Sequence, residues 1–171
     1  MLNNQYRIAI LTSSDKCSCG EREDKSAEVI REIATTHGYK IVSYKVLPDE
    51  QILLEEELKK LCDEEKVDLV LTTGGTGFSQ RDCMPEATLN VSQKLAYGIP
   101  EALRQHSISI TKKAMLSRSV AGIREKTLII NLPGSPKAVR EHLEYLMDDV
   151  LIHALDIITD KANECAHNEF V

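Results

Sequence analysis

The chain has 171 residues, of which 42% are hydrophobic and 28% charged, an ordinary composition for a globular protein. This length predicts a single domain over residues 1–171, with room for a full hydrophobic core. The net charge of −6 and the pI near 5.4 argue against a nucleic-acid surface, which needs a basic face, and no apolar run is long enough to predict a membrane span.

The start of the chain and its cysteines favour a cytoplasmic protein. Residues 1–5 lack a basic segment followed by an apolar one, so no secretory signal is expected. Cys17 and Cys19 have no second Cys/His pair at zinc-site spacing, so reduced thiols are favoured over a metal site.

The first half of the chain alternates strands and helices. Residues 6–11 predict a buried strand, and 12–15 the loop that leaves it. Asp24 or Ser26 caps the next helix, which ends at His37-Gly38, and strand 40–47 follows. A charged amphipathic helix over 50–65 comes next. Its predicted inward residues are Ile52, Leu54, Leu58, Leu61 and Cys62.

The middle of the chain contains a glycine-rich loop between a strand and a helix. Strand 67–72 runs into this loop, and Pro85 suits the first position of the helix behind it. That helix is predicted to run to about Leu95, before residues 98–101 break and restart it.

The last third is predicted to contain one strand and one long helix. Residues 116–122 fit either a short strand or an extended loop, and 127–132 form a strand. Ser135 caps a helix that begins at Pro136 and carries both His142 and His153 as surface or packing residues. Its apolar stripe is Val139, Leu143, Leu146, Val150, Ala154 and Ile157. The tail from about residue 163 is expected to be frayed.

This alternation predicts an α/β fold in three layers, with an open, mostly parallel sheet covered by helices on both faces. Ligands of such sheets bind outside the carboxyl ends of the strands. Four polar or glycine-rich motifs follow predicted strands, so they are expected to converge on one edge. They are Ser13-Ser14-Asp15, Pro48-Asp49, the segment from Gly74 to Asp82, and the segment from Asn131 to Pro136.

The glycine-rich loop fits neither common nucleotide-binding motif. A Walker loop would continue into lysine, and a dinucleotide fingerprint would have glycine where Gln80 stands. Gly74, Gly75 and Gly77 still allow backbone N–H groups to wrap an anion such as a phosphate. A tight strand–helix connection explains the glycines equally well, but it leaves Arg81-Asp82 unexplained.

One known family has this combination of motifs. Thr72-Thr73-Gly74-Gly75-Thr76-Gly77, with Arg81-Asp82 and Pro85-Glu86-Ala87-Thr88, resembles the signature of the MogA/MoaB molybdopterin-binding family, which includes the G domain of gephyrin. The likeness extends over nearly the whole chain. It includes Ser13-Ser14-Asp15, Pro48-Asp49, Leu116-Ser117-Arg118 and Asn131-Leu132-Pro133-Gly134-Ser135-Pro136.

The resemblance implies roles for individual residues. Asp49 and Asp82 match the family's catalytic aspartates, which would also hold Mg²⁺ with ATP. Judged without the resemblance, either aspartate fits a helix cap, and Gly134-Ser135-Pro136 fits a plain helix start. The residues implied to bind substrate are Ser13, Asp15, Thr73, Gly74, Gly75, Thr76, Gly77, Ser117, Arg118, Pro133, Gly134 and Ser135.

The resemblance also implies an activity, the transfer of AMP from Mg-ATP to molybdopterin with release of pyrophosphate. It implies a homotrimer and hand-over of the product to a molybdenum-insertion protein. A non-catalytic molybdopterin-binding carrier of the MoaB type is the alternative, and a nucleotide pyrophosphatase resembling CinA is a less favoured one. The motifs leave open which loop binds pterin and which binds adenosine.

Overall fold

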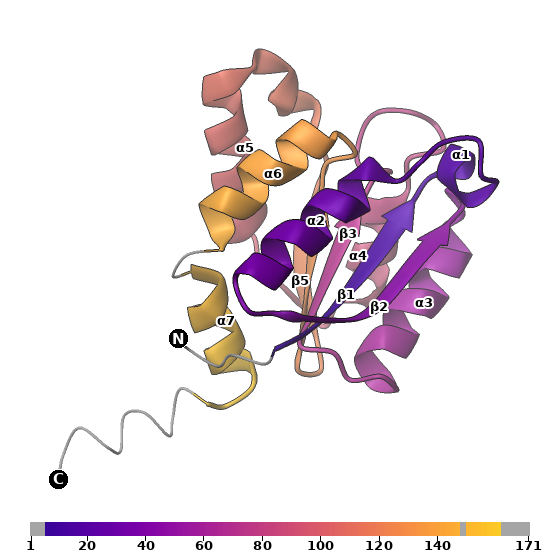
Figure 1. The fold of residues 1–171 in the computed structure, drawn as a ribbon. Helices are drawn as coiled ribbons and strands as arrows, with labels where there is room; N and C mark the ends of the chain where they lie inside the picture. Colours follow the sequence, from indigo (N-terminus) through magenta and orange to yellow (C-terminus); the bar gives the residue numbers. More distant parts are fainter. Residues whose placement is uncertain (1–5, 148–149, 162–171) are drawn as a thin grey trace, which may run out of the picture.

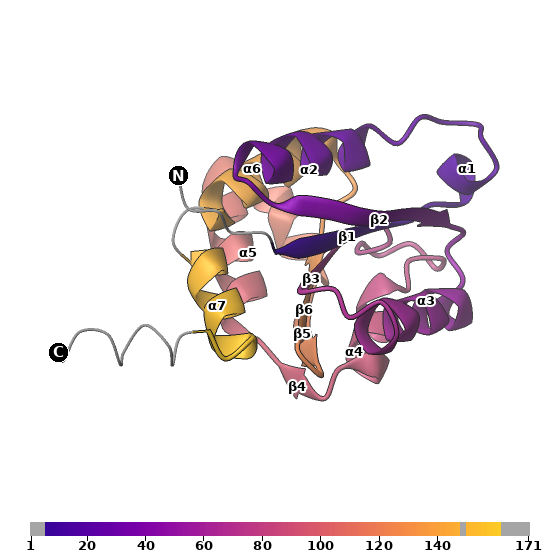
Figure 2. The same ribbon diagram turned by 60° about the horizontal axis from the view of Figure 1, so that its bottom comes forward.

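The computed structural model describes residues 6–147 and 150–161, and these form one six-stranded sheet between two layers of helices (Figures 1 and 2). The strand order is β2-β1-β3-β6-β5-β4. Parallel pairing joins β2 (Lys40–Leu47), β1 (Arg7–Ser13), β3 (Leu69–Thr73) and β6 (Thr127–Leu132). Antiparallel pairing adds β5 (Ala121–Arg124) and β4 (Lys94–Leu95) at one edge. The predicted three-layer α/β fold with a mostly parallel sheet is confirmed.

Each face of the sheet buries its own set of helices. One cluster contains residues of α2 (Lys25–Thr36), α5 (Gly98–Ile110), α6 (Pro136–Leu146) and α7 (Val150–Ile158). The other contains residues of α3 (Gln51–Asp63) and α4 (Met84–Val91), which lie across the sheet from α2 and α6 in Figure 2. Two short helices, α1 (Asp15–Ser18) and the 3₁₀ helix η1 (Lys112–Leu116), lie in connections.

Strand β1 shows why both faces are apolar. Its successive side chains point to opposite faces. Ile8 and Ile10 accordingly belong to the first cluster, whereas Ala9 and Leu11 belong to the second. A central strand covered on both sides needs such a continuous apolar run.

The order in which strands are added to the sheet reverses between β1 and β3. From β1 the chain crosses to β2 on one side, and from β2 it returns past β1 to β3 on the other. Helix α2, which follows β1, covers one face, and α4, which follows β3, covers the opposite face. A crevice therefore opens between the loops that leave β1 and β3, which is where open α/β sheets bind ligands.

Several predicted boundaries are confirmed. The Asp24 carboxylate caps α2 by accepting a hydrogen bond from the Ala27 N–H at 3.0 Å. Gly38, just past the end of α2, has a φ of +82°, the left-handed conformation that glycine adopts without steric cost. Strands β2 and β6 span the predicted residues.

The predicted helix from Pro85 to Leu95 is too long. It ends at Val91, and Lys94–Leu95 form strand β4 instead. The backbone turns extended at Ser92, and the next residue, Gln93, donates its N–H to the Ile123 carbonyl. Pairing with β5 thus replaces the last helical turn. Of the two alternatives for residues 116–122, the short strand is realised only from Ala121 onward.

The predicted last helix is in fact two helices, α6 and α7, so His142 and His153 lie on different ones. The predicted apolar stripe is wrong in α7. There Val150 is 57% exposed and Ile157 55%, whereas Leu151 and Leu155 are buried. Leu151 and Leu155 of α7 pack in the first cluster instead. The tail from residue 163 lies outside the described residues.

The predicted inward set of α3 contains one error. Ile52 is 72% exposed, whereas the other four predicted residues are buried. Glu57 is buried among them and forms an ion pair with Lys45 of β2. A charged residue at an inward position is accommodated here because it has an oppositely charged partner.

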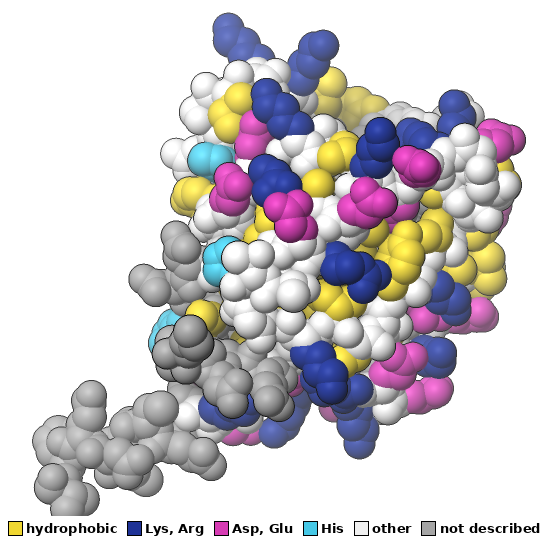
Figure 3. Space-filling model, viewed as in Figure 1, with side chains coloured by type: hydrophobic (Ala, Val, Ile, Leu, Met, Phe, Trp, Pro, Cys, Tyr) yellow, Lys and Arg dark blue, Asp and Glu magenta, His cyan; other side chains and the backbone are white. Residues whose placement is uncertain are grey.

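Charged side chains of both signs lie on the face of the molecule drawn in Figure 3. Figure 3 shows one face, on which basic and acidic side chains are interspersed. That face therefore offers no continuous basic surface. Among the helices of the described residues, none has the length and apolar character needed to cross a membrane.

Candidate functional site

The loops after β1, β2, β3 and β6 meet at the carboxyl edge of the sheet, as their motifs predicted. Gly74 lies at the centre of this meeting point. It has a φ of +84°, and a Cβ atom added to it would lie 2.2 Å from the Ser13 carbonyl oxygen. Gly134 also packs against it, since a Cβ built on Gly134 would lie 3.5 Å from the Gly74 Cα. At Gly74 only glycine allows the first and third loops to approach this closely, whereas the contact at Gly134 is an ordinary van der Waals distance.

Asp49 joins the second loop to the first. One of its carboxylate oxygens accepts a hydrogen bond from the Ser13 hydroxyl, and the other accepts one from the Asp15 N–H at 3.1 Å. The Asp49 N–H in turn donates to the Asp15 carboxylate at 3.0 Å. Asp49 is therefore not a helix cap: the N-cap of α3 is Glu50, which makes no side-chain capping bond.

Arg81 ties the glycine-rich loop to both neighbouring loops. Its guanidinium donates two hydrogen bonds to Asp15, at 2.9 and 3.1 Å, and a third to Glu50 at 2.8 Å. The hydrogen bonds from Arg81 and from the Asp49 backbone hold the pKa of the Asp15 carboxyl below its usual range. These side chains are about half exposed, so the bridge orders the loops more than it stabilises the fold.

Asp82 closes the glycine-rich loop. Its Oδ2 atom accepts a hydrogen bond from the Ser79 N–H at 3.1 Å, so its carboxylate closes a turn and does not cap α4. A Cβ on Gly77 would lie 2.8 Å from the same oxygen, so a larger residue there would have to displace the Asp82 carboxylate. The other oxygen, Oδ1, accepts no hydrogen bond from the residues that the structure describes.

The donor set can be tested against Mg²⁺. The described residues contain no group of three His, Cys, Asp or Glu side chains able to hold a metal ion. Mg²⁺ bound with a nucleotide needs only one or two carboxylates, because phosphate oxygens and water complete its shell. Asp82 fits this use through Oδ1, which accepts no hydrogen bond within the described part of the chain, and Asp49 fits it through the second lone pair of each oxygen.

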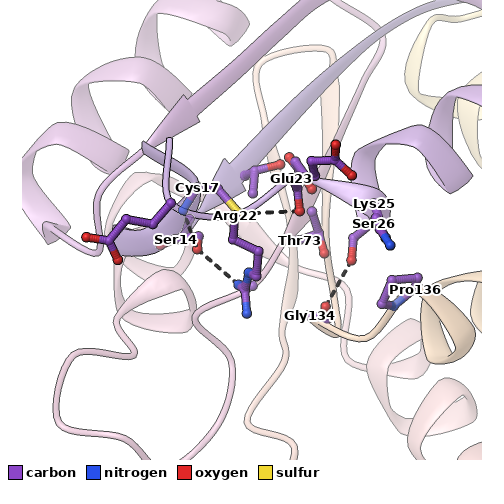
Figure 4. Close-up of a pocket in the computed structure, with 14 residues that line it drawn as sticks. Ser14, Cys17, Arg22, Glu23, Lys25, Ser26, Thr73, Gly134 and Pro136 are labelled. Atoms are coloured by element: carbon purple, nitrogen blue, oxygen red, sulfur yellow. Dashed lines mark hydrogen bonds between the residues drawn. The ribbon is translucent and has the colours of Figure 1, made fainter. Parts of the chain in front are cut away.

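A cavity of about 510 Å³ opens beside these loops (Figure 4). Its wall includes Thr73 and Gly74 of the glycine-rich loop and Ser13. Figure 4 shows Arg22 donating to the Ser14 hydroxyl, at 3.2 Å, at one side of this cavity. At the other side the Ser26 hydroxyl donates to the Gly134 carbonyl at 2.9 Å.

A second cavity, of about 350 Å³, is lined by the next residues of the same loop. Thr76 and Gly77 line it together with Ser117, Pro133 and Ser135. The Ser117 hydroxyl donates to Ser119. Ser135 occupies the N-cap position of α6 but makes no side-chain capping bond, contrary to the predicted cap.

Arg118 contacts protein groups with its whole guanidinium. Nε donates to the Gly77 carbonyl at 2.6 Å, Nη2 donates to the Asp82 carbonyl at 2.8 Å, and Nη1 pairs with Glu86. In this conformation Arg118 braces the glycine-rich loop. A sequence pattern identifies Arg118 as a cation near this edge, but it does not show which groups the cation meets.

Sequence reasoning missed several residues of the two cavities, namely Arg22, Arg104, Ser107 and, as a cavity residue, His142. Each lies outside the glycine, Ser-Asp and Pro-Asp motifs, and Ser107 meets His142 only through the packing of α5 on α6. No local signal marks such a pair.

One cysteine near the aspartates, Cys83, has a perturbed thiol. Burial, with Asp49 nearby, raises the pKa of the Cys83 thiol to about 11. Cys17 lines the first cavity, and its thiol donates only a weak bond to the Glu23 carbonyl. The described cysteines, Cys17, Cys19, Cys62 and Cys83, are free, in agreement with the expected reduced thiols.

Known proteins are similar to this chain in sequence and in fold. Residues 9–153 match a family model described as "Probable molybdopterin binding domain". A molybdopterin adenylyltransferase of Helicobacter pylori J99 is 47% identical over 139 residues, which cover 80% of this chain and 79% of that protein. One of Escherichia coli K12 is 40% identical over 158 residues, covering 89% and 80% respectively.

The fold comparison agrees with the sequence comparison. The molybdopterin biosynthesis enzyme MoaB of Thermus thermophilus superposes with a TM-score of 0.86 at 43% identity. The match covers 91% of this chain and 98% of that one.

Proposed function

The chain belongs to the family of molybdopterin-binding domains, and we propose that it is a molybdopterin adenylyltransferase of molybdenum cofactor biosynthesis. Its reaction moves AMP from ATP to molybdopterin. A terminal phosphate oxygen of molybdopterin attacks the α-phosphorus of ATP, the bond to the β-phosphate breaks, and pyrophosphate leaves.

One observation carries this proposal: two cavities meet at a single glycine-rich loop that ends in Asp82. A reaction that joins two substrates through their phosphates needs one anion-binding segment that both substrates reach. The backbone N–H groups of Gly74 to Gly77 and the N-terminus of α6 supply such donors. Nucleotidyl transfer depends mainly on positioning and charge stabilisation. Backbone N–H donors and a helix N-terminus are groups of the kind that such a reaction needs.

Asp82 and Asp49 have different parts in the proposed mechanism. Asp82 would hold Mg²⁺, which neutralises phosphate charge when it is bound. Asp49 keeps Ser13 and Asp15 in place at the first loop, and the remaining lone pairs of its two oxygens would face substrate or Mg²⁺. The other positions proposed to bind substrate are Thr73, Gly74, Gly75, Thr76, Gly77, Ser117, Arg118, Pro133, Gly134 and Ser135.

The reaction is tested by incubating purified protein with molybdopterin and Mg-ATP and separating the products by chromatography. Adenylyl-molybdopterin and pyrophosphate are expected in equal amounts. Tight molybdopterin binding without product would instead identify a carrier. Hydrolysis of ADP-ribose-like compounds in the absence of pterin would identify a pyrophosphatase.

The proposal extends to assembly and location. A cytoplasmic homotrimer that hands its product to a molybdenum-insertion protein fits the family resemblance. Light scattering at micromolar concentration is expected to give the mass of three chains. A monomeric mass would contradict this part of the proposal alone.

A further inference from the structure

The segment between η1 and β5 is held by an arginine from a different helix. Arg104 of α5 donates from Nε to the Ser117 carbonyl at 3.1 Å and from Nη2 to the Ser119 carbonyl at 3.0 Å. These two carbonyls flank Arg118. The planar guanidinium suits this task because it holds two acceptors in a fixed relation.

The segment that Arg104 holds is the one that braces the glycine-rich loop. The Arg118 N–H donates to the Thr76 carbonyl at 2.9 Å, near the start of the loop. Its side chain reaches the Gly77 and Asp82 carbonyls and pairs with Glu86 in the first turn of α4. Arg118 thus spans the loop from its first half to its end.

These contacts connect α5 to Asp82 through two arginines. The Asp82 backbone is fixed by Arg118, and its carboxylate by the Ser79 N–H. Ser119, which Arg104 also holds, is buried, so losing that bond would leave an enclosed carbonyl without its partner. Moving the 117–119 segment would therefore displace the loop that carries Asp82.

We propose that Arg104 is a positioning residue for Asp82, acting through Arg118. Within the described residues Arg104 makes no hydrogen bond to Asp82 or to the glycine-rich loop, and no motif of the sequence includes it. The inference deepens the proposed function, on which it rests, by adding a residue outside the site that sets the geometry of its acidic group.

A direct role of Arg104 is the competing explanation. Arg104 lines the second cavity, where a cation would attract an anionic substrate. Two of its guanidinium nitrogens, however, already donate to carbonyls. The two roles differ kinetically: lost substrate binding raises KM, whereas a misplaced Asp82 lowers kcat.

The test compares Arg104→Ala with Arg140→Ala, a control that removes an exposed arginine of α6 paired with Glu32. Arg104→Ala is expected to lower kcat about 10- to 100-fold and to change KM for molybdopterin by less than about threefold. Millimolar guanidinium chloride should restore part of kcat, because the free ion fits between the same carbonyls. Arg140→Ala should behave as wild type.

Hydrogen exchange supplies a readout that does not depend on turnover. In Arg104→Ala, exchange should accelerate at the amides of Ser79, Asp82 and Arg118, which donate within this assembly. If the wild type makes no adenylylated product, the proposed function fails, and the exchange data alone decide whether Arg104 orders the loop.

Three results would overturn the proposal: unchanged kcat and exchange, a raised KM at constant kcat, or a loss of kcat that guanidinium does not restore. If Arg104→Ala does not fold, Arg104→Lys takes its place. The single ammonium group of lysine cannot reproduce both hydrogen bonds of the Arg104 guanidinium. The kcat and the amide exchange rates of Arg104→Lys should then lie between those of wild type and those of a fully released loop.

Discussion

Single glycines decide whether the loops can meet. Gly74 combines a positive φ with backbone contact to Ser13, so it is constrained both by conformation and by space. Gly98, at the start of α5, has neither constraint: nothing lies within 4 Å of an added Cβ. The two glycines therefore form a matched pair for mutation.

Gly74→Ala is expected to lower the free energy of unfolding by about 2–4 kcal/mol, because the methyl group would overlap the Ser13 carbonyl. Gly98→Ala should be neutral or slightly stabilising, since alanine favours helix. Urea unfolding of both variants checks this. Equal stability of the two variants would show that the loops do not pack as described.

Arg81 lowers the pKa of the Asp15 carboxyl. Replacing Arg81 with glutamine should raise the pKa of the Asp15 carboxyl toward its usual value, although the Asp49 N–H still lowers it. Carbon-detected NMR titration of the carboxyl groups measures the shift. An Asp15 pKa equal in wild type and Arg81→Gln would rule out the ion pair in solution.

At the scale of elements, a buried polar contact joins α5 to α6. The Ser107 hydroxyl and the His142 Nε2 lie 2.7 Å apart, and His142 is only 5% exposed. Its Nδ1 atom is buried without a partner among the described residues. Burial, with the nearby His106, lowers the pKa of His142 to about 4.

This shift predicts a dependence of stability on pH. The unfolded chain binds a proton at His142 below about pH 6.5, whereas the folded chain does so only below about pH 4. Neutral His142 therefore makes its full contribution to the free energy of unfolding above pH 6.5, and this contribution is lost as the pH falls toward 4. It amounts to at most about 3 kcal/mol.

Urea unfolding between pH 4 and 7 measures this dependence. His142→Gln, which keeps a polar group near Ser107 but does not titrate, should have a flatter pH profile than wild type. His153→Gln removes an exposed histidine and serves as the matched control. A His142→Gln profile parallel to wild type would contradict the assignment.

Periodicity predicted elements well where one cause determines them. Helix α2 has an Asp cap, a regular apolar face and a terminal glycine, and its predicted boundaries are confirmed. Strand β4 has no such signal of its own, because only pairing with β5 makes Lys94–Leu95 a strand. The start of α7 was missed for a related reason: an apolar stripe does not reveal where a helix breaks.

At the scale of the whole molecule, the sheet topology brings separated motifs together. Asp15 and Asp49 are 34 residues apart, and Asp15 and Arg81 are 66 apart, yet both pairs are hydrogen-bonded. The rule for ligand position in α/β sheets predicted the shared edge. It could not predict that Arg81 would bridge two loops or that Arg118 would brace a third, because these contacts depend on side-chain geometry.

The most direct test of the proposed chemistry is a paired measurement on Asp82→Asn: turnover of molybdopterin with Mg-ATP, and molybdopterin affinity by titration calorimetry. The variant keeps an oxygen for the Ser79 N–H but loses the charge that would hold Mg²⁺. Turnover should fall below detection while affinity stays within about threefold of wild type. Wild-type turnover in Asp82→Asn would show that the catalytic group lies elsewhere.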